Sequence, residues 1–566
     1  MTPTPEQQAI FAACKNTDSH LIVDAKAGSG KTTTLIEALP LLRGSISLQA
    51  FNKSIAEELK ARVSQLGIMT FSRTSVSTVH AHGLNSFRMA QRKPVVQGGK
   101  LSFMMKDQMS NYPDHDPVRK NSRHITRLVG MAKAAGFGLG KQLNTPQKYP
   151  AIDDASEWQL LIDWFNLELE FEGQISCEQV IEEAQELLKA SNRREAMIDF
   201  DDMVYLPLLL GLPIKRYDNV LLDEAQDINA TRRELAFQSL APGARMIAVG
   251  DARQAIYGFT GAAADGMTRI AQRLGSAKHL PLSICWRCDD AILDEARKIV
   301  PGIQTAPHKL GKGLVRSIPF RAEAGQQYAA ADFLAMPKAG DAILCRLNKP
   351  NVAVALGLLR RGTPAKIEGR DIGKKLLDHA RKATEAYGLQ PLGETRLELD
   401  DYKAREIYKL IQRERESAAA LLNDEVEACQ LLIDRVLETM PTKISGEWPQ
   451  LEALVNELFG DDISPRSTVT LSSVHKAKGR EWPRVFLLGR SDYMPFFKAE
   501  LQWEIEQEMN LIYVAITRAE KELVYVTGVA SALDKGLHRE AALAAPVVID
   551  PLNLAADRDM LEASYD

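Results

Sequence analysis

A glycine loop near the N-terminus carries residue types that bind phosphate groups. Residues 25–32 read AKAGSGKT and lie between an apolar segment and a helical one. Backbone N–H groups of such a loop can surround phosphate oxygens, its lysine can contact the β- and γ-phosphates, and its hydroxyl can bind Mg²⁺. The strict P-loop pattern has glycine where this chain has Ala25, but the flanking segments argue against a chance Gly-Lys-Thr. The predicted nucleotide-binding residues are Ala27, Gly28, Ser29, Gly30, Lys31, Thr32 and Thr33, with Thr32 also a metal ligand.

Asp223 and Glu224 form an acidic pair that can complete this site. They follow the apolar run NVLL at 219–222, so they stand at the C-terminal end of a strand, where α/β sheets bind ligands. Magnesium needs a protein carboxylate, and an attacking water needs a positioned base. A helix cap or a solvated turn is the alternative for such a pair, but the glycine loop earlier in the chain favours catalysis.

Strands and helices have to position these residues, and the sequence around the loop alternates between the two. Residues 21–24 read as a strand, TTLIEALPLL as a helix and SISLQAFN as a second strand. This alternation predicts a parallel sheet with crossover helices. Further short apolar runs predict buried strands in two groups, at 219–224 and 245–251, and at 341–346, 467–473, 483–489 and 523–528.

Two long, polar and mostly helical stretches interrupt these groups, at 84–195 and 372–466. Neither carries a strand-loop-helix unit, so each is predicted to be an insertion into an α/β domain. We therefore expect an α/β fold with two parallel-sheet domains, each with a mainly helical insertion. The first sheet domain comprises 1–83 and 196–280, the second comprises 281–371 and 467–547, and 548–566 is an acidic tail.

The composition is that of a soluble protein with several domains. The chain has 566 residues, of which 45% are hydrophobic and 25% charged, and a formal net charge of −4. This charge gives no global basic signature, so any nucleic acid has to be met by a local groove. No signal peptide and no apolar stretch of about 18 residues is evident, which predicts a cytoplasmic protein that does not bind membranes.

The cysteines, histidines and remaining aspartates argue against a metal centre. The six cysteines lack a disulfide framework, and the single CxxC, Cys285 and Cys288, has no second ligand pair nearby for zinc. His80 and His82 form an H-x-H without a third ligand, so we favour a structural role or a contact other than metal binding. A helix cap explains three aspartates that precede MVYLPLLL, namely Asp199, Asp201 and Asp202.

Several segments, in order along the chain, resemble the motifs of UvrD/Rep-type superfamily 1 DNA helicases. TPEQQ, DFDDMVYLP and VHKAKGREW are closest in wording to the F-box DNA helicase-like relatives. The resemblance extends from residue 4 to about residue 528 and implies two RecA-like domains with ATP hydrolysed between them. The segments that resemble motifs II, III, V and VI are LLDEAQD (221–227), VGDARQAIYGFTGA (249–262), LSSVHKAKGREW (471–482) and NLIYVAITRAEK (510–521).

The resemblance implies roles for residues of the first sheet domain. Gln7 stands where the family reads adenine, with Gln8 as the alternative. Asp223 would hold Mg²⁺, and Glu224 would be the base that orients or deprotonates water. Gln254 would sense the γ-phosphate and link hydrolysis to DNA. The implied cofactors are ATP and Mg²⁺.

The resemblance also implies roles for residues of the second sheet domain. Arg287 and Arg518 would be arginine fingers, which stabilise charge on the transferred phosphoryl group. Glu481 matches the residue that contacts the ribose. The segment CWRC at 285–288 departs from the family's usual Asn-Tyr-Arg-Ser, but Trp286 can present a flat face to adenine as tyrosine would. A buried core tryptophan is the alternative.

Aromatic and polar residues in the matching motifs are implied DNA contacts, because bases stack on aromatic faces whatever their sequence. Thr260 stands where the family usually has arginine, so we do not expect this position to make the polar coupling contact that the family's arginine makes. The implied DNA-binding residues are Phe51, Asn52, His80, Tyr257, Phe259 and His475.

The resemblance implies an ATP-dependent DNA helicase or translocase that moves 3′ to 5′ on single-stranded DNA. It would unwind tailed duplexes as a monomer in repair, recombination or replication. One alternative is a translocase that strips bound proteins, such as a recombinase or a single-strand-binding protein. Another is an ATP-switched DNA-binding regulator, against which Glu224, Gln254 and the two arginines argue. An RNA helicase is the less favoured alternative, because the motifs resemble those of the DNA helicases.

Overall fold

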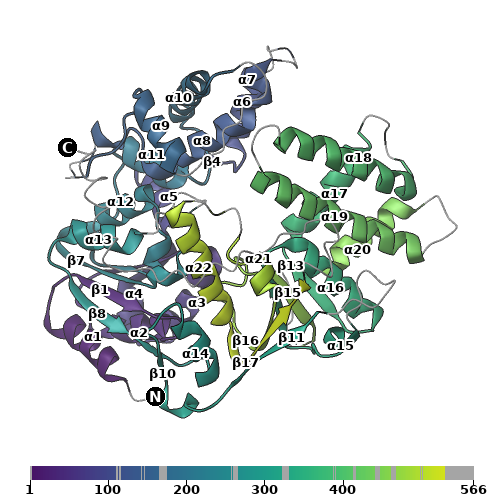
Figure 1. The fold of residues 1–566 in the computed structure, drawn as a ribbon. Helices are drawn as coiled ribbons and strands as arrows, with labels where there is room; N and C mark the ends of the chain where they lie inside the picture. The colour runs from purple at the N-terminus through teal and green to yellow at the C-terminus, as the bar shows by residue number, and fades with distance from the viewer. Residues whose placement is uncertain are drawn as a thin grey trace.

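The computed structural model describes residues 3–109, 113, 116–141, 143, 145, 147–164, 175–256, 258, 265–320, 331–385, 388, 390–411, 416–439, 446–460, 467–496, 499 and 501–529. Within this part of the chain, two large parallel sheets are flanked by helices, and two mainly helical regions extend from them (Figure 1). The predicted α/β class is therefore confirmed.

The first large sheet has six strands, all parallel to their neighbours. Its core lies on both faces, because alternate residues of β1 pack in opposite directions. Leu21 and Val23 pack with α1, α2 and α3, whereas Ile22 packs with α12 and α13. In sheet order the strands are β3 (Thr74–Thr78), β2 (Ile46–Ala50), β6 (Tyr217–Leu222), β7 (Leu240–Gly250), β1 (Leu21–Ala25) and β8 (Lys278–Leu282).

The helices around this sheet cover its two faces, as parallel strands require. They are α1 (Pro5–Asn16), α2 (Lys31–Ala38), α3 (Lys53–Ser64), α4 (Ile68–Arg73), α12 (Ala230–Gln238) and α13 (Gly266–Leu274). Because parallel strands end at one edge, the loops that follow β1, β6 and β7 come together there.

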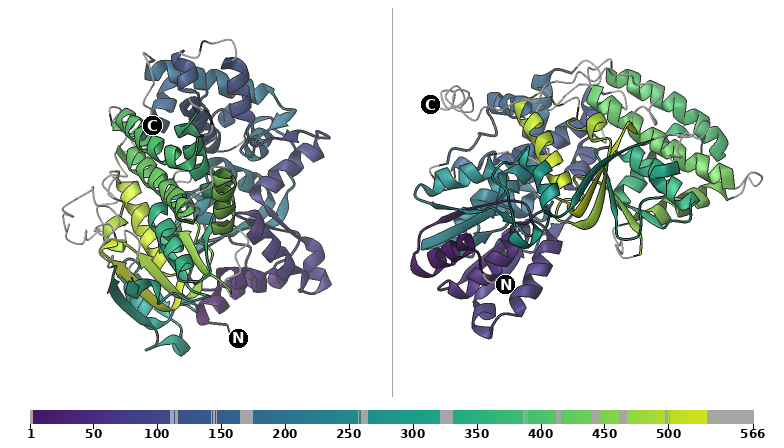
Figure 2. Two further views of the ribbon diagram at one scale, coloured as in Figure 1. Left: turned by 90° about the vertical axis from the view of Figure 1, so that its right-hand side faces the viewer. Right: turned by 60° about the horizontal axis from the view of Figure 1, so that its bottom comes forward.

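The second large sheet has seven strands, also parallel to their neighbours. In sheet order they are β11 (Leu314–Pro319), β17 (Ala519–Thr527), β16 (Trp482–Leu488), β12 (Ala342–Cys345), β15 (Val469–Ser473), β13 (Ala365–Glu368) and β14 (Phe459–Gly460). Its helices are α14 (Asp290–Arg297), α15 (Ala331–Leu334), α16 (Asn348–Arg360), α21 (Arg490–Tyr493) and α22 (Gln502–Ile516). Helix α22, yellow in Figures 1 and 2, lies between the two sheets.

The first helical region has an apolar core of its own, to which α5 and α11 also contribute. Its helices are α5 (Val79–Met89), α6 (Lys100–Met109), α7 (Pro117–Lys120), α8 (Ser122–Ala135), α9 (Ala155–Trp164), α10 (Cys177–Arg193) and α11 (Asp202–Leu209). A short strand pair, β4 (Val95–Val96) with β5 (Met197–Ile198), lies where the chain enters and leaves this region.

The second helical region shares one continuous apolar core with the second sheet. It consists of α17 (Arg370–Ala383), α18 (Leu392–Ile411), α19 (Glu416–Thr439) and α20 (Glu447–Leu458). In the views of Figures 1 and 2, α18 and α19 extend away from the sheet. No helix in the described ranges is both long enough and apolar enough to cross a membrane.

The strands predicted from apolar runs are confirmed, whereas β3, β8, β11, β13 and β14 were not predicted. Four of these five form the edges of the two sheets. An edge strand is covered on fewer sides than a central one, so it does not need a continuous apolar run. Strand β3 reads TSVST and is only half-buried, and β8 contains Pro281.

Two buried lysines join helices of the first helical region. Lys100 of α6 binds Asp202 at 2.7 Å, and Lys133 of α8 binds Asp199 and Asp202 at 2.7 Å each. The Oδ1 atom of Asp199 also accepts the amide of Asp202 at 2.7 Å, so Asp199 binds the first turn of α11 as a cap does. Asp201 stands at the N-cap position but makes no side-chain cap hydrogen bond, so the predicted cap role is wrong for Asp201. The buried ion pairs were not predicted.

Candidate functional site

The glycine loop between β1 and α2 has a backbone that other residues would strain. Gly28 and Gly30 have φ angles of +66° and +80°, in the left-handed region. A side chain at Gly28 would also collide with Cys285 Sγ at 2.7 Å and with Arg287 Cβ at 2.8 Å. The hydroxyl of Ser29 is buried and has no hydrogen-bond partner among the described residues. The unpaired hydroxyl and the glycine backbone fit a phosphate group.

Gln7 of α1 is directed toward the helix that follows this loop. Its Nε2 donates to the hydroxyl of Thr34 at 3.0 Å, and its backbone and side chain form a capping box with Thr4. Gln8, the alternative for the adenine-reading residue, instead reaches out to the carbonyl of Pro3 at the surface. The geometry therefore favours Gln7.

The acidic pair at the end of β6 faces the lysine of the glycine loop. Lys31 Nζ contacts Glu224 Oε2 at 3.0 Å, and the hydroxyl of Thr32 donates to Asp223 Oδ2 at 3.4 Å. Burial opposes ionisation of Glu224, but the charges of Lys31 and Lys478 lower its pKa. Burial and the charge of Glu224 raise the pKa of Asp223. Oxygen ligands from Thr32 and Asp223 are of the kind that Mg²⁺ prefers.

Gln254 follows β7 and is bound to the acidic edge of the sheet. Its Nε2 donates to Asp251 Oδ2 at 2.7 Å. The amide of Asp251 in turn donates to Gln226, which donates to Glu224 at 2.6 Å. Hydrogen bonds therefore connect the predicted γ-phosphate sensor to the predicted base.

Residues of the second sheet domain reach into the same network. The hydroxyl of Tyr513 in α22 accepts the amide of Ala27 at 3.0 Å and donates to Asp251 at 3.3 Å. Lys478 binds Asp227 at 2.5 Å and the carbonyl of Gln254 at 2.6 Å. Tyr513 and Lys478 were not singled out from the sequence, although both lie in the segments that resemble motifs VI and V.

The two predicted arginine fingers lie beside each other at this junction. Arg287 forms an ion pair with the exposed carboxylate of Glu481 and donates to the carbonyl of Thr517 at 3.2 Å. Arg518 is 1% exposed and donates to the carbonyls of Val514 at 2.9 Å and Arg480 at 3.0 Å. Burial, followed by the charge of Arg287, lowers the pKa of Arg518 to about 9.

Trp286 lies at the surface of the glycine loop. Its amide donates to the carbonyl of Gly28 at 2.8 Å, and its half-buried ring stacks on His308 with centroids 5.7 Å apart. The alternative of a fully buried core tryptophan is therefore wrong. Thr33, the last predicted loop residue, has its hydroxyl bound by Arg62 at 2.9 Å.

The predicted DNA-binding residues are only partly brought together. Arg232 lies 5.9 Å from the centre of the half-buried Phe51 ring. Burial and the charge of Arg232 lower the pKa of His80 to about 4, which places His80 near the same arginine. Asn52 accepts the amide of Ile55 at 2.9 Å and so caps α3.

Of the remaining predicted DNA contacts, the structure describes His475 but not Tyr257 or Phe259. Burial, Arg346 and Lys478 lower the pKa of His475 to about 3, so its ring is neutral at pH 7. Tyr257, Phe259 and Thr260 lie outside the described residues.

The structure describes His82 and the surroundings of the other candidate metal ligands. His82 is buried and shares a hydrogen bond with Ser239 at 2.8 Å, which is a structural role. Among the described residues, no group of three or more histidines, cysteines, aspartates or glutamates could hold a metal ion.

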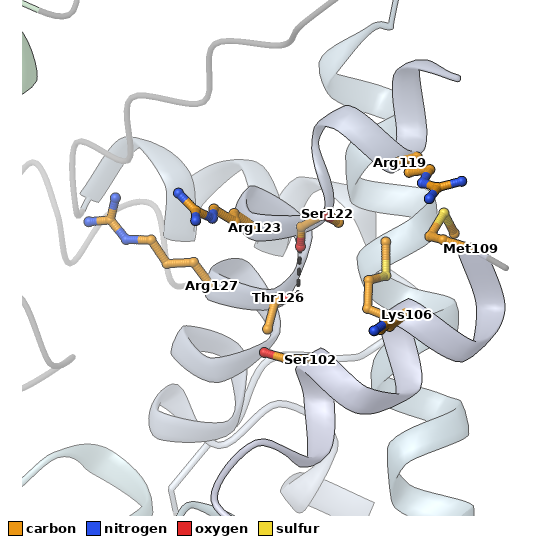
Figure 3. Close-up of a pocket in the computed structure, with 9 residues that line it drawn as sticks. Ser102, Lys106, Met109, Arg119, Ser122, Arg123, Thr126 and Arg127 are labelled. Atoms are coloured by element: carbon orange, nitrogen blue, oxygen red, sulfur yellow. Dashed lines mark hydrogen bonds between the residues drawn. The ribbon is translucent and has the colours of Figure 1, made fainter. Parts of the chain in front are cut away.

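A basic pocket of about 730 Å³ lies on the first helical region, between α6 and α8. Figure 3 shows Arg123 and Arg127 on one side of it, and Lys106 and Arg119 on the other. The described residues that line it include serines, a threonine and methionines but no carboxylate. Burial raises the pKa of Tyr402 in α18, and the charge of Arg123 opposes this shift, so the pocket lies near the second helical region.

The glycine loop, the acidic pair and the two sheets that meet beside them define a P-loop ATPase with its site between two RecA-like domains. Residues 4–274 match the UvrD/REP helicase N-terminal domain, and residues 397–528 match the UvrD-like helicase C-terminal domain. The chain therefore belongs to the UvrD-like helicase family, and it is an ATP-dependent DNA helicase of that family.

Similar proteins cover most of the chain at low identity. It is 24% identical to the ATP-dependent DNA helicase Rep of Salmonella typhimurium, over 89% of this chain and 88% of Rep. It is also 24% identical to F-box DNA helicase protein 1 of Schizosaccharomyces pombe, over 92% of this chain and 57% of that protein. The crystal structure of Arterivirus nonstructural protein 10, a helicase, is similar with a TM-score of 0.30 and 11% identity. The match covers 94% of this chain and 64% of the Arterivirus chain. That likeness is too low to bear on the fold.

Proposed function

We propose that this protein is a cytoplasmic, monomeric motor that moves 3′ to 5′ along one DNA strand and unwinds the duplex ahead of it. The observation that supports this most directly is the network at the domain junction. It joins the glycine loop, Glu224 and Gln254 of one sheet domain to Tyr513 and Lys478 of the other. A change at the nucleotide would thereby reach both domains.

The proposed roles at the phosphates follow from these contacts. Lys31 would contact the β- and γ-phosphates, and Thr32 and Asp223 would hold Mg²⁺, which neutralises charge on phosphate oxygens. The γ-phosphate would compete with Glu224 for the ammonium of Lys31. The charges of Lys31 and Lys478 keep Glu224 ionised, and Glu224 would become more basic once Lys31 turns to the γ-phosphate, so that it could accept the proton of the attacking water.

The second sheet domain would supply positive charge and the walls for base and ribose. Arg287 and Arg518 would stabilise the charge that develops on the transferred phosphoryl group. Arg287 would exchange its contact with Glu481 for a phosphate, which leaves Glu481 to accept a ribose hydroxyl. Trp286 would stack on adenine, and Gln7 would read its edge.

DNA would pass over the Phe51 and His80 surface of the first sheet domain, toward the basic pocket between α6 and α8. Bases stack on aromatic faces, and cationic side chains gathered on one surface attract phosphates. The relatives named above are DNA helicases, which supports DNA as the track. The segment that contains Tyr257 and Phe259 would provide the second grip.

Unwinding assays with tailed duplexes test the polarity. We expect ATPase activity to rise with single-stranded DNA and much less with RNA, and a 3′-tailed duplex to be unwound. Efficient unwinding of only the 5′-tailed duplex would contradict the proposed direction. Strong DNA-stimulated ATPase with displacement of a bound protein, but no strand separation, would favour the stripping translocase instead.

A further inference from the structure

Cys285 and Cys288 form a thiol pair in a buried turn beside the ATP site. Cys285 ends β9 (Ile284–Cys285), and Cys288 lies two residues before α14; both are 0% exposed. The amide of Cys288 donates to the sulfur of Cys285 at 3.4 Å, and the two thiols also hydrogen-bond to each other. A turn that brings residues i and i+3 into contact suits a disulfide between them.

The turn contacts both parts of the proposed catalytic site. The sulfur of Cys285 lies against Gly28 of the glycine loop, and the thiol of Cys288 donates to the carbonyl of Thr517 at 3.7 Å. Arg287 lies between the two cysteines and donates to the same carbonyl.

Cys285 differs from the other cysteines in its pKa, whereas the hydrogen bond with Cys285 and burial raise the pKa of Cys288. The neighbouring thiol of Cys288, backbone amides and Arg287 lower the pKa of Cys285 to about 6, although burial opposes this. A thiolate beside a neutral thiol is the arrangement in which one sulfur attacks and the other resolves. Burial chiefly raises the pKa of the other four cysteines, which favours their unreactive thiol form; they are Cys14, Cys177, Cys345 and Cys429.

We propose that Cys285 and Cys288 form a reversible intramolecular disulfide that switches off ATP hydrolysis. The effect on turnover depends on the proposed function; the disulfide itself does not. The thiolate of Cys285 attacks a small-molecule disulfide and releases one thiolate. Cys288 then attacks the mixed disulfide, its proton passes to the released thiolate, and a second thiolate leaves and takes up a proton from water. Two protein thiols are oxidised, and one small disulfide is reduced to two thiols.

The new bond would act on the site through Arg287 and the glycine loop. It removes the thiol donor from the carbonyl of Thr517 and ties together the residues on either side of Arg287. The sulfur of Cys285 also has to move away from Gly28 to bond to Cys288. Because Gly28 covers Cys285, the glycine loop and the turn must separate before oxidation, and bound nucleotide is expected to slow the reaction.

The test treats the full chain with oxidised glutathione in a Cys177→Ser background, which removes the one half-buried thiol. We expect the peptide with both cysteines to lose the mass of two hydrogen atoms. The kcat of the DNA-stimulated ATPase should fall about ten-fold or more, with nucleotide still bound, and dithiothreitol should restore it. A Cys285→Ser/Cys288→Ser variant, which has neither thiol, should keep its turnover after the same treatment, whereas Cys288→Ser, which lacks only the resolving thiol, should hold a glutathione adduct at Cys285.

Three outcomes would overturn the proposal. One is the absence of the internal disulfide from the peptide map. Another is a stable glutathione adduct at Cys285 in the parent protein. The third is an equal loss of turnover in the parent and in a Cys285→Ser/Cys288→Ser variant. If the reduced protein hydrolyses no ATP but the disulfide forms, the proposed function fails and the thiol chemistry stands.

Discussion

Glu224 has an unusual backbone conformation at the end of β6. Its φ angle is +51°, a region that residues other than glycine rarely adopt. Contacts with Lys31 and Gln226 hold its side chain toward the glycine loop. Such strain tends to occur at functional sites, where surrounding contacts maintain it. The backbone conformation therefore agrees with the proposed role of Glu224 as the base.

Replacing this carboxylate tests that role. Glu224→Gln should lower kcat about 10²- to 10⁴-fold, because the amide cannot accept the proton of the attacking water. Nucleotide affinity should change little, as measured by titration with a fluorescent ATP analogue. Glu37→Gln, on the exposed face of α2, is the matched control and should retain full turnover. Unchanged turnover in Glu224→Gln would exclude it as the base.

Tyr513 is the residue through which α22 contacts both the glycine loop and Asp251. In Tyr513→Phe the amide of Ala27 loses its acceptor, at a cost of about 1–3 kcal/mol for a buried donor. We expect DNA-stimulated kcat to fall about ten-fold and basal ATPase to fall less, because the lost contact links the two domains. Tyr525→Phe, in β17, provides the control. Equal losses in basal and stimulated rates would argue against a coupling role.

The helices of the first helical region are joined by charge as well as by apolar packing. Lys100, Lys133, Asp199 and Asp202 connect α6 and α8 to the start of α11 with their side chains almost fully buried. Such a cluster is tolerated because each charge has a partner of opposite sign, and it becomes costly when one partner is lost. It therefore fixes how α11 sits against the other helices.

Asp202→Ala should strongly destabilise this region. Two lysines would lose a buried partner, and we expect a loss of about 3–5 kcal/mol. Urea unfolding followed by circular dichroism and tryptophan fluorescence should show an earlier transition. Asp153→Ala removes the partner of Lys189 at the surface and should change stability by less than about 1 kcal/mol. Similar shifts in both variants would show that the buried cluster contributes little.

In the whole molecule the proposed nucleotide site lies where residues of the two sheet domains meet, and the basic pocket lies on the first helical region. The net charge of −4 does not indicate nucleic-acid binding. The pocket nevertheless gathers Lys106, Arg119, Arg123 and Arg127 on one surface. Because salt screens charge, this basic surface attracts only phosphates that lie close to it. The proposed DNA path is therefore expected to be narrow.

Arg123→Ala/Arg127→Ala tests this path. Affinity for tailed DNA should fall similarly for all sequences, because phosphate contacts do not read bases. The slope of log K against log salt should become shallower by about 1 per lost contact. Fluorescence anisotropy at several salt concentrations measures both. Arg269→Ala/Lys298→Ala, on α13 and directly after α14, is the control, and an equal change in its slope would exclude a specific path.

The sequence by itself determined the glycine loop, the acidic pair, the central strands other than β13 and the order of the family motifs. These features are local: phosphate binding requires glycines and lysine at fixed spacing, and central parallel strands require continuous apolar runs. The edge strands escaped prediction because partial exposure removes that requirement.

Only the tertiary structure showed that Tyr513 and Lys478 complete the network around Glu224 and that Cys285 packs on Gly28. It also revealed the buried lysine–aspartate cluster and the basic pocket. Each of these depends on residues that are distant in the chain or belong to different helices. No local pattern encodes such contacts, because packing of whole elements decides which side chains meet.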